Sequence, residues 1–386
     1  MRIALYYPWI YLRSGIERMM LELVSRSRHD WVIFTSHYNP DQTYPEFRKL
    51  PVVELSRVPV DRGYFPVGKA AMTIFREKIN LKDFDALVVS SEGLGDFITF
   101  RNHDVPVICY CHTPLKVIHD HFARRRYLNE NKRMKIPFFL YAGVFRAADW
   151  LAWRNYQYIF CNSQEVRRRI LKAGLAPEGK IDVLSPGLDT SVMQPTWNYQ
   201  KYFMVVGRIK WWKNLELALQ SFIEFKRRYP RFAEFKLIIA GQVDRKSEAY
   251  LRKLKRIAAG RDDIIFRRDP AEEELMEIYR NGYSLMFPSL NEDWGMTLLE
   301  AMGFGKPVIS VNQGGPVESV IDSETGYLVE AAPGAFADAM ALLAEDQNLT
   351  RKLGEAAALH VQKYDWEHFV DRFDSYLSSL GPRQAP

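Results

Sequence analysis

The length, composition and charge of this chain indicate a globular protein of two domains. Its 386 residues are 47% hydrophobic and 26% charged, as in folded domains, and they are too many for one ordinary core. No run approaches the roughly 18 to 20 apolar residues that cross a bilayer, and the first residues do not resemble a signal peptide. The net charge of +6 is too mild to establish a nucleic-acid or membrane partner by itself. We therefore expect a cytoplasmic protein.

The cysteine pattern excludes a disulfide framework. The three cysteines are Cys109, Cys111 and Cys161. Cys109 and Cys111 alternate along an apolar run, which predicts that they pack as small hydrophobic side chains. Neither the cysteines nor the histidines that follow Cys111 match a standard zinc spacing, so we expect no metal.

Apolar, β-branched runs alternate with helical patterns along the first half of the chain. These runs span residues 2–7, 31–36, 52–56, 86–91, 105–113 and 158–163. Continuous apolar strands separated by helices are typical of parallel sheets that are buried on both faces. The pattern therefore predicts a doubly wound α/β domain.

The same alternation resumes after residues 185–201, whose proline, glycine and polar residues indicate a linker. Further strands are expected at residues 202–209, 235–242, 263–269, 283–290, 307–313 and 326–330. We therefore predict two Rossmann-like domains, residues 1–190 and 191–365. The amphipathic helix of residues 366–386 is expected to pack back on the first domain.

Two junctions between a strand and a helix carry groups suited to binding an anion. Gly15 would let backbone N–H groups approach a phosphate, although many such turns need glycine for geometry alone. Arg208 and Lys213 would hold a diphosphate and stabilise the charge on a leaving group. The alternative for these two cations is a solvated basic loop. Ligands of such domains bind at the carboxyl ends of the strands, which favours the first interpretation.

The strand of residues 105–113 ends at His112, which is either a structural histidine or part of a site at the sheet edge. Residues 122–145 follow, where a basic cluster stands beside an apolar, aromatic stretch. The cluster consists of Arg124, Arg125, Arg126, Lys132, Arg133 and Lys135. A core helix beside solvated charges would explain this segment. A contact with an anionic membrane surface and an RNA-binding face are the alternatives.

Two glutamates, Glu292 and Glu300, are separated by eight positions across a turn that contains glycine. One interpretation is surface charge at the start of a helix. The other places Glu292 in a loop and Glu300 within the helix, with both carboxylates directed into one cleft.

The ordered motifs together resemble the retaining glycosyltransferases of family 4. That family has the GT-B architecture, an α/β fold with two Rossmann-like, doubly wound parallel-sheet domains facing a central cleft. The motifs are the glycine loop, CHTP at 111–114, VLSPGLDTSVMQP at 183–195, GRI with its following lysine, IIAG, the paired glutamates and GGPVESVIDSETGYLVE at 314–330. CHTP and the EDWG turn are most similar to the mannosyltransferase branches.

The resemblance implies a role for each residue around the two glutamates. Glu300 would accept hydrogen bonds from the ribose of a nucleotide, and Glu292 would face the donor sugar. The backbone N–H groups of Gly295, Met296 and Thr297 would approach the sugar and the phosphates. The two carboxylates would therefore bind opposite ends of one donor instead of forming an acid/base pair.

The resemblance also implies roles for the other candidates. Arg208 and Lys213 would clamp the diphosphate, and Gly15 would lie near the phosphate. His112 would lie near the anomeric carbon or the hydroxyls of the donor sugar. No cofactor is implied, because the two cations would supply the positive charge.

The implied reaction moves a hexose, with mannose from GDP-mannose favoured, to a hydroxyl of a glycan or lipid-linked acceptor. Retention would follow from front-face attack, in which the departing phosphate helps to deprotonate the acceptor. The alternatives are a UDP-hexose donor, or a sugar-nucleotide epimerase or phosphorylase on the same scaffold. A third is a nucleic-acid or membrane-binding module without catalysis. We expect no nucleic-acid partner, and the membrane interpretation of residues 122–145 would place the protein at the inner face of the membrane.

Three positions depart from the pattern of the family. Ser14 stands where a second glycine is common, so the backbone would approach a phosphate differently there. Asn214 replaces a glycine after Lys213 and would alter that loop. Arg267 and Arg268 stand where an F-x-G turn borders the base, so the sequence does not define the base pocket.

Overall fold

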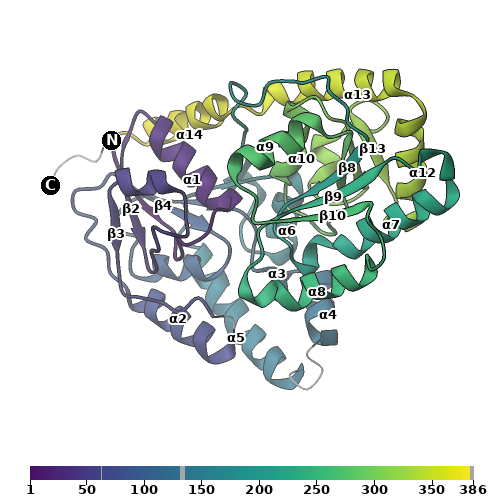
Figure 1. Ribbon diagram of the computed structural model, residues 1–386. Coiled ribbons are helices and arrows are strands. Elements are labelled where there is room, and N and C mark those ends of the chain that lie inside the picture. Colours follow the sequence, from purple (N-terminus) through teal and green to yellow (C-terminus); the bar gives the residue numbers. More distant parts are fainter. Residues whose placement is uncertain (62, 131–134, 383–386) are drawn as a thin grey trace. The chain divides into compact units, whose positions relative to one another are not determined.

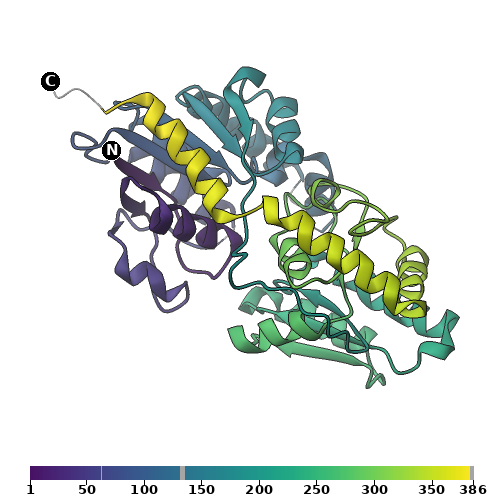
Figure 2. The same cartoon turned by 90° about the horizontal axis from the view of Figure 1, so that it is seen from above.

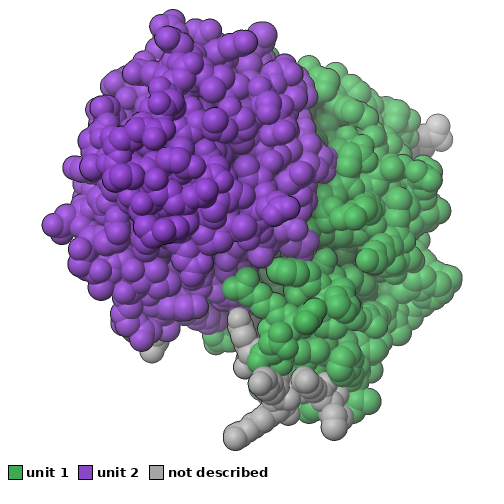
Figure 3. Space-filling view, turned by 90° about the vertical axis from the view of Figure 1, so that its right-hand side faces the viewer, with its two compact units in different colours: residues 1–186, 366–386 green, residues 187–365 purple. Residues whose placement is uncertain are grey.

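The structure is a computed structural model that describes residues 1–61, 63–130 and 135–382. The chain forms two compact units, which Figures 1 and 3 show. Unit 1 contains residues 1–186 and 366–386, and unit 2 contains residues 187–365. Lys132 and Arg133 of the basic cluster lie outside the described residues.

Unit 1 is built on a seven-stranded sheet in which all neighbouring strands pair in parallel. The strand order is β3-β2-β1-β4-β5-β6-β7. The strands are β1 (Arg2–Tyr6), β2 (Asp30–Thr35), β3 (Val52–Glu54), β4 (Ala86–Ser91), β5 (Val107–Cys111), β6 (Tyr158–Cys161) and β7 (Ile181–Val183). All six predicted runs of this half contain strands. The seventh strand, β7, was missed because its three residues lie in a segment rich in glycine and proline.

Helices connect these parallel strands, as a doubly wound sheet requires. They are α1 (Gly15–Arg26), α2 (Tyr64–Arg76), α3 (Lys116–His119), α4 (His121–Glu130), α5 (Lys135–Trp153) and α6 (Gln164–Ala173). The strand order reverses beside β1, so helices before and after this point cover opposite faces of the sheet. Both faces of β4 and β5 are buried in consequence. All three cysteines are free and buried, as the sequence predicts.

The last helix, α14 (Trp366–Leu380), belongs to unit 1 although unit 2 precedes it in sequence. Figure 2 shows it in yellow, running beside α1. Its Phe369 packs edge to face on Tyr110 of β5, with ring centroids 5.5 Å apart. The carboxylate of Asp374 accepts hydrogen bonds from the Ser27 hydroxyl at 2.6 Å and the Arg28 backbone N–H at 2.8 Å. These contacts join the end of the chain to the first sheet.

Unit 2 repeats the architecture with six parallel strands in the order β10-β9-β8-β11-β12-β13. They are β8 (Tyr202–Val206), β9 (Lys236–Gly241), β10 (Ile264–Arg268), β11 (Ser284–Phe287), β12 (Val308–Val311) and β13 (Gly326–Val329), one in each predicted run. The helices are α7 (Leu215–Arg228), α8 (Glu248–Ile257), α9 (Glu272–Asn281), α10 (Met296–Gly303), α11 (Pro316–Ser319), α12 (Pro333–Glu345) and α13 (Gln347–His360). The strand order reverses between β8 and β11, which makes the loops after these strands the expected place for a ligand.

None of the helices in the described part of the chain is both long and apolar enough to cross a membrane.

Candidate functional site

The loops that follow β8 and β11 bring together two of the predicted site residues. Lys213 ends a short 3-10 helix (Trp211–Lys213), and its Nζ donates a hydrogen bond to Oε2 of Glu292 at 2.7 Å. The hydroxyl of Ser289 donates to the same carboxylate oxygen at 2.7 Å. Both charged side chains remain about one-fifth exposed. The predicted cation and the predicted sugar-facing carboxylate therefore form one ion pair that solvent can reach.

Arg208 lies between β8 and that short helix, half-buried, and no ion pair within the described ranges includes it. It follows Gly207, whose φ of 142° is accessible chiefly to glycine. The neighbouring loop comes very close, since a Cβ on Gly241 would overlap the carbonyl oxygen of Gly207. The glycine of the IIAG motif is thus required by the approach of two backbones.

Asn214 occupies the position after Lys213 where glycine is common in the family, and it adopts the backbone conformation that glycine would adopt. Its φ and ψ are 52° and 42°, in the left-handed region that asparagine tolerates better than most residues. Its side-chain amide also donates to the carbonyl oxygen of Pro288 at 3.2 Å. The substitution therefore preserves the turn and joins it to the end of β11.

The EDWG turn is held in place by the glycine pair of the next loop. The backbone N–H of Gly315 donates to the carbonyl oxygen of Glu292 at 3.0 Å. A Cβ on Gly315 would overlap the carbonyl oxygen of Asp293 and lie 2.6 Å from Cα of Trp294. A Cβ on Gly314 would lie 2.7 Å from the carbonyl oxygen of Glu292. The glycines of GGPVES are thus needed for packing against the loop that carries Glu292.

Glu300 is the fifth residue of α10, so the helix carries it away from the loop of Glu292. Its Oε2 accepts a hydrogen bond from the Tyr279 hydroxyl at 2.6 Å. Tyr279 is buried and stacks on Phe304 with ring centroids 5.7 Å apart. The structure therefore gives the two glutamates different partners, which include a lysine for Glu292 and a tyrosine for Glu300.

The first turn of α10 contains the remaining predicted donor contacts. Gly295 precedes the helix with φ of 95°, and no side chain caps this end of α10 in the described structure. The first backbone N–H groups of a helix have no acceptor within the helix. The hydroxyl oxygen of Thr297 is buried there and has no hydrogen-bond partner among the described residues. The uncapped turn of Met296 and Thr297 therefore offers donors that suit an anion.

In unit 1, Gly15 is the first residue of α1, the position predicted for it. Ser14 is the N-cap, and its hydroxyl oxygen accepts from the backbone N–H of Ile16 at 3.3 Å and contacts the carboxylate of Glu17. Serine thus has a local structural reason to replace the second glycine.

His112 follows β5 directly and is buried. Its Nε2 forms a hydrogen bond with the Ser90 hydroxyl at 2.8 Å, and its carbonyl oxygen accepts from the Asn162 amide at 3.0 Å. Burial lowers the pKa of His112 to about 3, so the imidazole is neutral at physiological pH. The ring can exchange hydrogen bonds but does not carry a charge.

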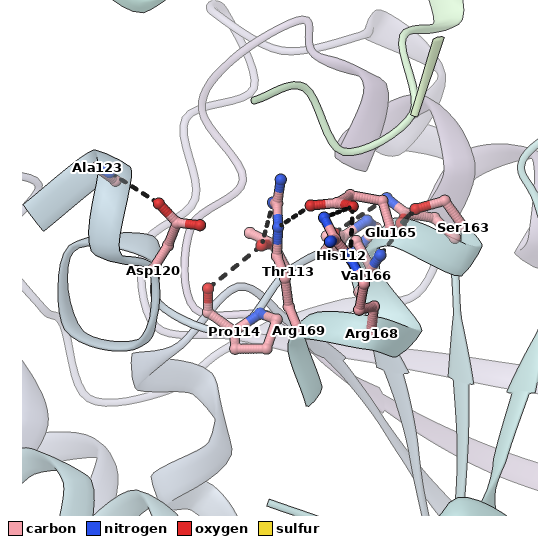
Figure 4. Close-up of polar contacts among 11 residues, drawn as sticks. His112, Thr113, Pro114, Asp120, Ala123, Ser163, Glu165, Val166, Arg168 and Arg169 are labelled. Carbon is pink, nitrogen blue, oxygen red and sulfur yellow. Dashed lines mark hydrogen bonds and ion pairs between the residues drawn. The ribbon is translucent and has the colours of Figure 1, made fainter. Parts of the chain in front are cut away.

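A buried arginine of α6 stands beside this histidine, as Figure 4 shows. Nε of Arg169 donates to Oε1 of Glu165 at 2.9 Å, and Nη1 donates to the Thr113 hydroxyl at 3.4 Å. The sequence analysis missed this pair. Its signal was the four-residue spacing of Glu165 and Arg169 on one helix face.

The other residues singled out in the sequence have surface partners. Arg267 pairs with Glu274 at 3.5 Å, and Arg268 pairs with Glu248 at 2.7 Å. No group of three or more metal-binding side chains occurs in the part of the chain that the structure describes.

Two family descriptions match consecutive parts of this chain. Residues 13–192 match the description Glycosyltransferase Family 4, and residues 194–360 match Glycosyl transferases group 1. The chain is 25% identical to the Alpha-1,3/1,6-mannosyltransferase ALG2 of Mus musculus, an alignment that covers 95% of this chain and 94% of that protein. It is 28% identical to the D-inositol 3-phosphate glycosyltransferase of Arthrobacter sp., over 48% of this chain and 47% of that protein.

A solved structure of HepE from Anabaena, in complex with UDP-glucose, has a similar fold. The TM-score is 0.74 at 17% identity, covering 98% of this chain and 100% of that chain. The fold is therefore GT-B, as predicted. Within that class the chain belongs to glycosyltransferase family 4, which makes it a retaining glycosyltransferase that uses a nucleotide sugar.

Proposed function

We propose that this glycosyltransferase transfers mannose from GDP-mannose to a hydroxyl of a glycan or lipid-linked acceptor. The proposal rests on the CHTP and EDWG motifs and on the similarity to a mannosyltransferase over most of both chains. Residues 191–365 are the donor side in this proposal, and residues 1–190 are the acceptor side.

The observation that supports this donor side best is the ion pair of Lys213 and Glu292, together with Arg208 on the same loop, which forms no ion pair with any described residue. The loop of these cations follows β8, next to the point where the strand order reverses. A bound diphosphate would replace Glu292 as the partner of Lys213, because two phosphates attract the ammonium more strongly than one carboxylate does. Glu292, still bound to the Ser289 hydroxyl, would then accept hydrogen bonds from hydroxyls of the sugar in place of Lys213.

The proposed reaction exchanges one bond for another at the anomeric carbon. The bond between that carbon and the phosphate oxygen breaks, and the acceptor oxygen forms a new bond on the same face. The acceptor proton passes to an oxygen of the departing phosphate. Arg208, Lys213 and the first N–H groups of α10 would stabilise the negative charge on this leaving group.

Glu300 and His112 would orient the donor without moving a proton. The carboxylate of Glu300 would accept hydrogen bonds from the ribose hydroxyls while Tyr279 holds its position. The neutral imidazole of His112 would bind a hydroxyl near the anomeric carbon, and Ser90 would fix its tautomer. Gly15 would allow the first N–H groups of α1 to approach the phosphate.

The competing donor is a UDP-hexose, because HepE was solved with UDP-glucose. A panel of GDP-mannose, UDP-glucose, UDP-galactose and UDP-N-acetylglucosamine distinguishes the two. We expect GDP-mannose to give the largest rise in thermal stability and to be slowly hydrolysed. A larger rise with a UDP-sugar would assign the donor to that nucleotide. A response to none of the four would contradict the proposed donor side.

We further propose that unit 1 contacts an anionic membrane surface through α2 and α5, at the inner face of the membrane. One side of α5 packs into the core, but its other side exposes Leu140 and Val144, each to more than 70%. Rings of Tyr64 and Tyr141, 5.7 Å apart, join α2 to α5, which lie side by side in Figure 1. On α2, Phe65 is 82% exposed.

Exposed cations accompany these apolar side chains. Lys69 and Arg76 of α2 line a shallow cavity of about 830 Å³ with Phe65 and Met72. No ion pair among the described residues includes either cation. Glu77 also lines this cavity, so the two cations exceed the acid by one charge. Exposed apolar side chains beside an excess of positive charge suit the interface of an anionic bilayer.

Sedimentation with anionic vesicles tests this membrane contact. Leu140→Asp and Val144→Asp should each reduce binding, because a carboxylate opposes both insertion and the negative surface. Leu359→Asp is the matched control, since Leu359 is 77% exposed on α13 of unit 2. Equal binding by all three variants would contradict the membrane contact and favour the alternative that α5 is a core helix beside solvated charges.

A further inference from the structure

A cluster of cations surrounds a pocket of unit 1 that the proposed function does not use. The pocket has a volume of about 360 Å³ and is formed by the helices α3, α4, α5 and α6. Its basic side chains are those of Arg124, Arg146 and Lys172, with His121 at its edge. Binding pockets for small molecules start at roughly 300 Å³. The pocket is therefore large enough for a phosphate or diphosphate group.

Two of the cations are held close together in spite of their like charges. An Nη of Arg124 and the Nη2 of Arg146 both donate to the carbonyl oxygen of Ile118, the second at 3.0 Å. Burial lowers the pKa of Arg124, and the positive charge of Arg146 lowers it further. Nε of Arg124 is buried and has no hydrogen-bond partner among the described residues. The two guanidinium groups thus share one neutral acceptor, and one buried donor nitrogen, Nε of Arg124, has no partner among the described residues.

The acidic groups nearby do not balance this charge. Asp149 lies beneath the pocket, where its Oδ2 is 2.6 Å from Nε2 of His119. Burial raises the pKa of Asp149 to about 8 and lowers the pKa of His119 to about 4, which favours the neutral form of each group. The charge of Asp120 raises the pKa of Arg124, and one of its oxygens accepts from the Ala123 backbone N–H at 2.8 Å, so it offsets only one of the three positive charges.

The ion pairs formed by the described residues do not include Arg124, Arg146 or Lys172. Arginine presents several N–H donors in a plane and binds phosphate oxygens through two hydrogen bonds at once. A phosphate between the two guanidinium groups would relieve their repulsion and engage the unused Nε donor. Lys172, on α6, would add a third charge from the opposite wall of the pocket.

We infer that this pocket is a binding site for a phosphate group with free oxygens, supplied either by a soluble phosphate compound or by the headgroup of a lipid. Trp150, 41% exposed on α5, lines the pocket, and exposed Leu151 follows it on the same helix. The site therefore borders the apolar side of α5. The inference depends on neither the proposed donor nor the proposed reaction.

The test compares charge-neutralised variants of the full chain in two binding assays. The pocket variants are Arg124→Gln, Arg146→Gln and Lys172→Gln, and the matched control is Arg125→Gln, which removes one charge from an exposed neighbour on α4. Calorimetry with inorganic pyrophosphate measures the soluble ligand. Vesicles of phosphatidylcholine with phosphatidic acid measure the lipid headgroup, and vesicles with phosphatidylserine at equal surface charge control for general attraction.

We expect each pocket variant to lose about tenfold or more in affinity relative to Arg125→Gln, because each removes a charge-assisted hydrogen bond. A loss with pyrophosphate identifies a site for soluble phosphate, and a loss confined to phosphatidic acid identifies a lipid site. Any pyrophosphate bound by Arg208 and Lys213 is common to all variants and cancels in the comparison.

Equal binding by the pocket variants and Arg125→Gln in both assays would overturn the inference. So would a loss with phosphatidylserine as large as that with phosphatidic acid. Circular dichroism checks that each variant folds. If the arginine variants do not fold, Lys172→Gln alone tests the site, because the side chain of Lys172 is exposed and its removal should not disturb the fold. Neither assay measures sugar transfer, so failure here is distinct from failure of the proposed function.

Discussion

The two sheets of this protein place different chemistry after their strands. The loops of unit 2 carry charged groups that solvent reaches, with Lys213 and Glu292 as an ion pair. The end of β5 in unit 1 carries His112, which is buried, neutral and bound to Ser90. A partly exposed ion pair can exchange one partner for a ligand, whereas a buried neutral group keeps its position and its charge state. From this comparison we expect unit 2 to respond to a charged donor and unit 1 to supply fixed geometry.

The largest effect is expected when the cations of unit 2 are removed. Lys213→Ala should lower turnover by about 10²- to 10³-fold, because the developing charge on the phosphate loses a stabilising donor. Steady-state kinetics with the donor that the panel identifies measures this loss. The control is Lys201→Ala, which breaks an exposed ion pair with Glu234 in the same unit and should change little. If Lys213→Ala turns over as fast as this control, Lys213 does not stabilise the leaving group and is not part of the site.

The next effect concerns the second glutamate. Glu300→Ala should weaken nucleotide binding by roughly 1.5–3 kcal/mol, since the ribose hydroxyls lose a charged acceptor. Calorimetric titration with the nucleotide measures the affinity. Tyr279→Phe keeps the carboxylate and removes only its hydrogen bond, so a smaller loss is expected. If both variants bind like the wild type, Glu300 supports the fold of α10 and does not touch the donor.

The backbone contacts around Glu292 predict a loss of stability. Gly315→Ala should lower the free energy of unfolding by roughly 1–3 kcal/mol, because a Cβ would overlap Asp293 and crowd Trp294. Gly68→Ala is the control, since a Cβ at Gly68 in α2 meets nothing within 4 Å. That variant should gain about 0.5–1 kcal/mol, because alanine is the better helix former. Denaturant unfolding compares the two, and equal stabilities would show that the turn adjusts freely.

The last prediction concerns how the free energy of unfolding depends on pH through His112. Its pKa is about 3 in the fold and near 6.5 when unperturbed, so between these values the unfolded state binds more protons. The free energy of unfolding should therefore fall as the pH falls, by at most about 1.4 kcal/mol per pH unit from this residue. His112→Gln can keep a hydrogen bond to Ser90 but cannot titrate, so its stability should fall less steeply. Parallel profiles for the two proteins would mean that the histidine is not kept neutral.

Much of the fold could be predicted because buried parallel strands leave a clear pattern. Every expected run of both halves contains a strand. One strand, β7, was not expected, because its three residues lie in a segment rich in glycine and proline. The pattern also places Gly15 at the start of α1 and Glu300 inside α10. Local chemistry sets these features, so the local sequence carries them.

The partners of the site residues could not be predicted in the same way. Lys213 and Glu292 are 79 residues apart, and Ser90 and His112 are 22 apart. The contact of Gly241 with Gly207 and that of Gly315 with Asp293 also join separate loops. No period in the sequence records such contacts, because they depend on which strands become neighbours in a sheet.

The sequence by itself determined two doubly wound sheets, the family and the position of each candidate residue relative to its strand or helix. Hydrophobic periodicity and turn chemistry act over a few residues, and the ordered motifs add the family. The tertiary structure alone decided the charge state and partner of each group. It leaves His112 neutral by burying it, pairs Lys213 with Glu292, and brings Arg124 close to Arg146 near a buried acid whose pKa is raised. Burial and long-range contacts control these properties, and both exist only after the chain has folded.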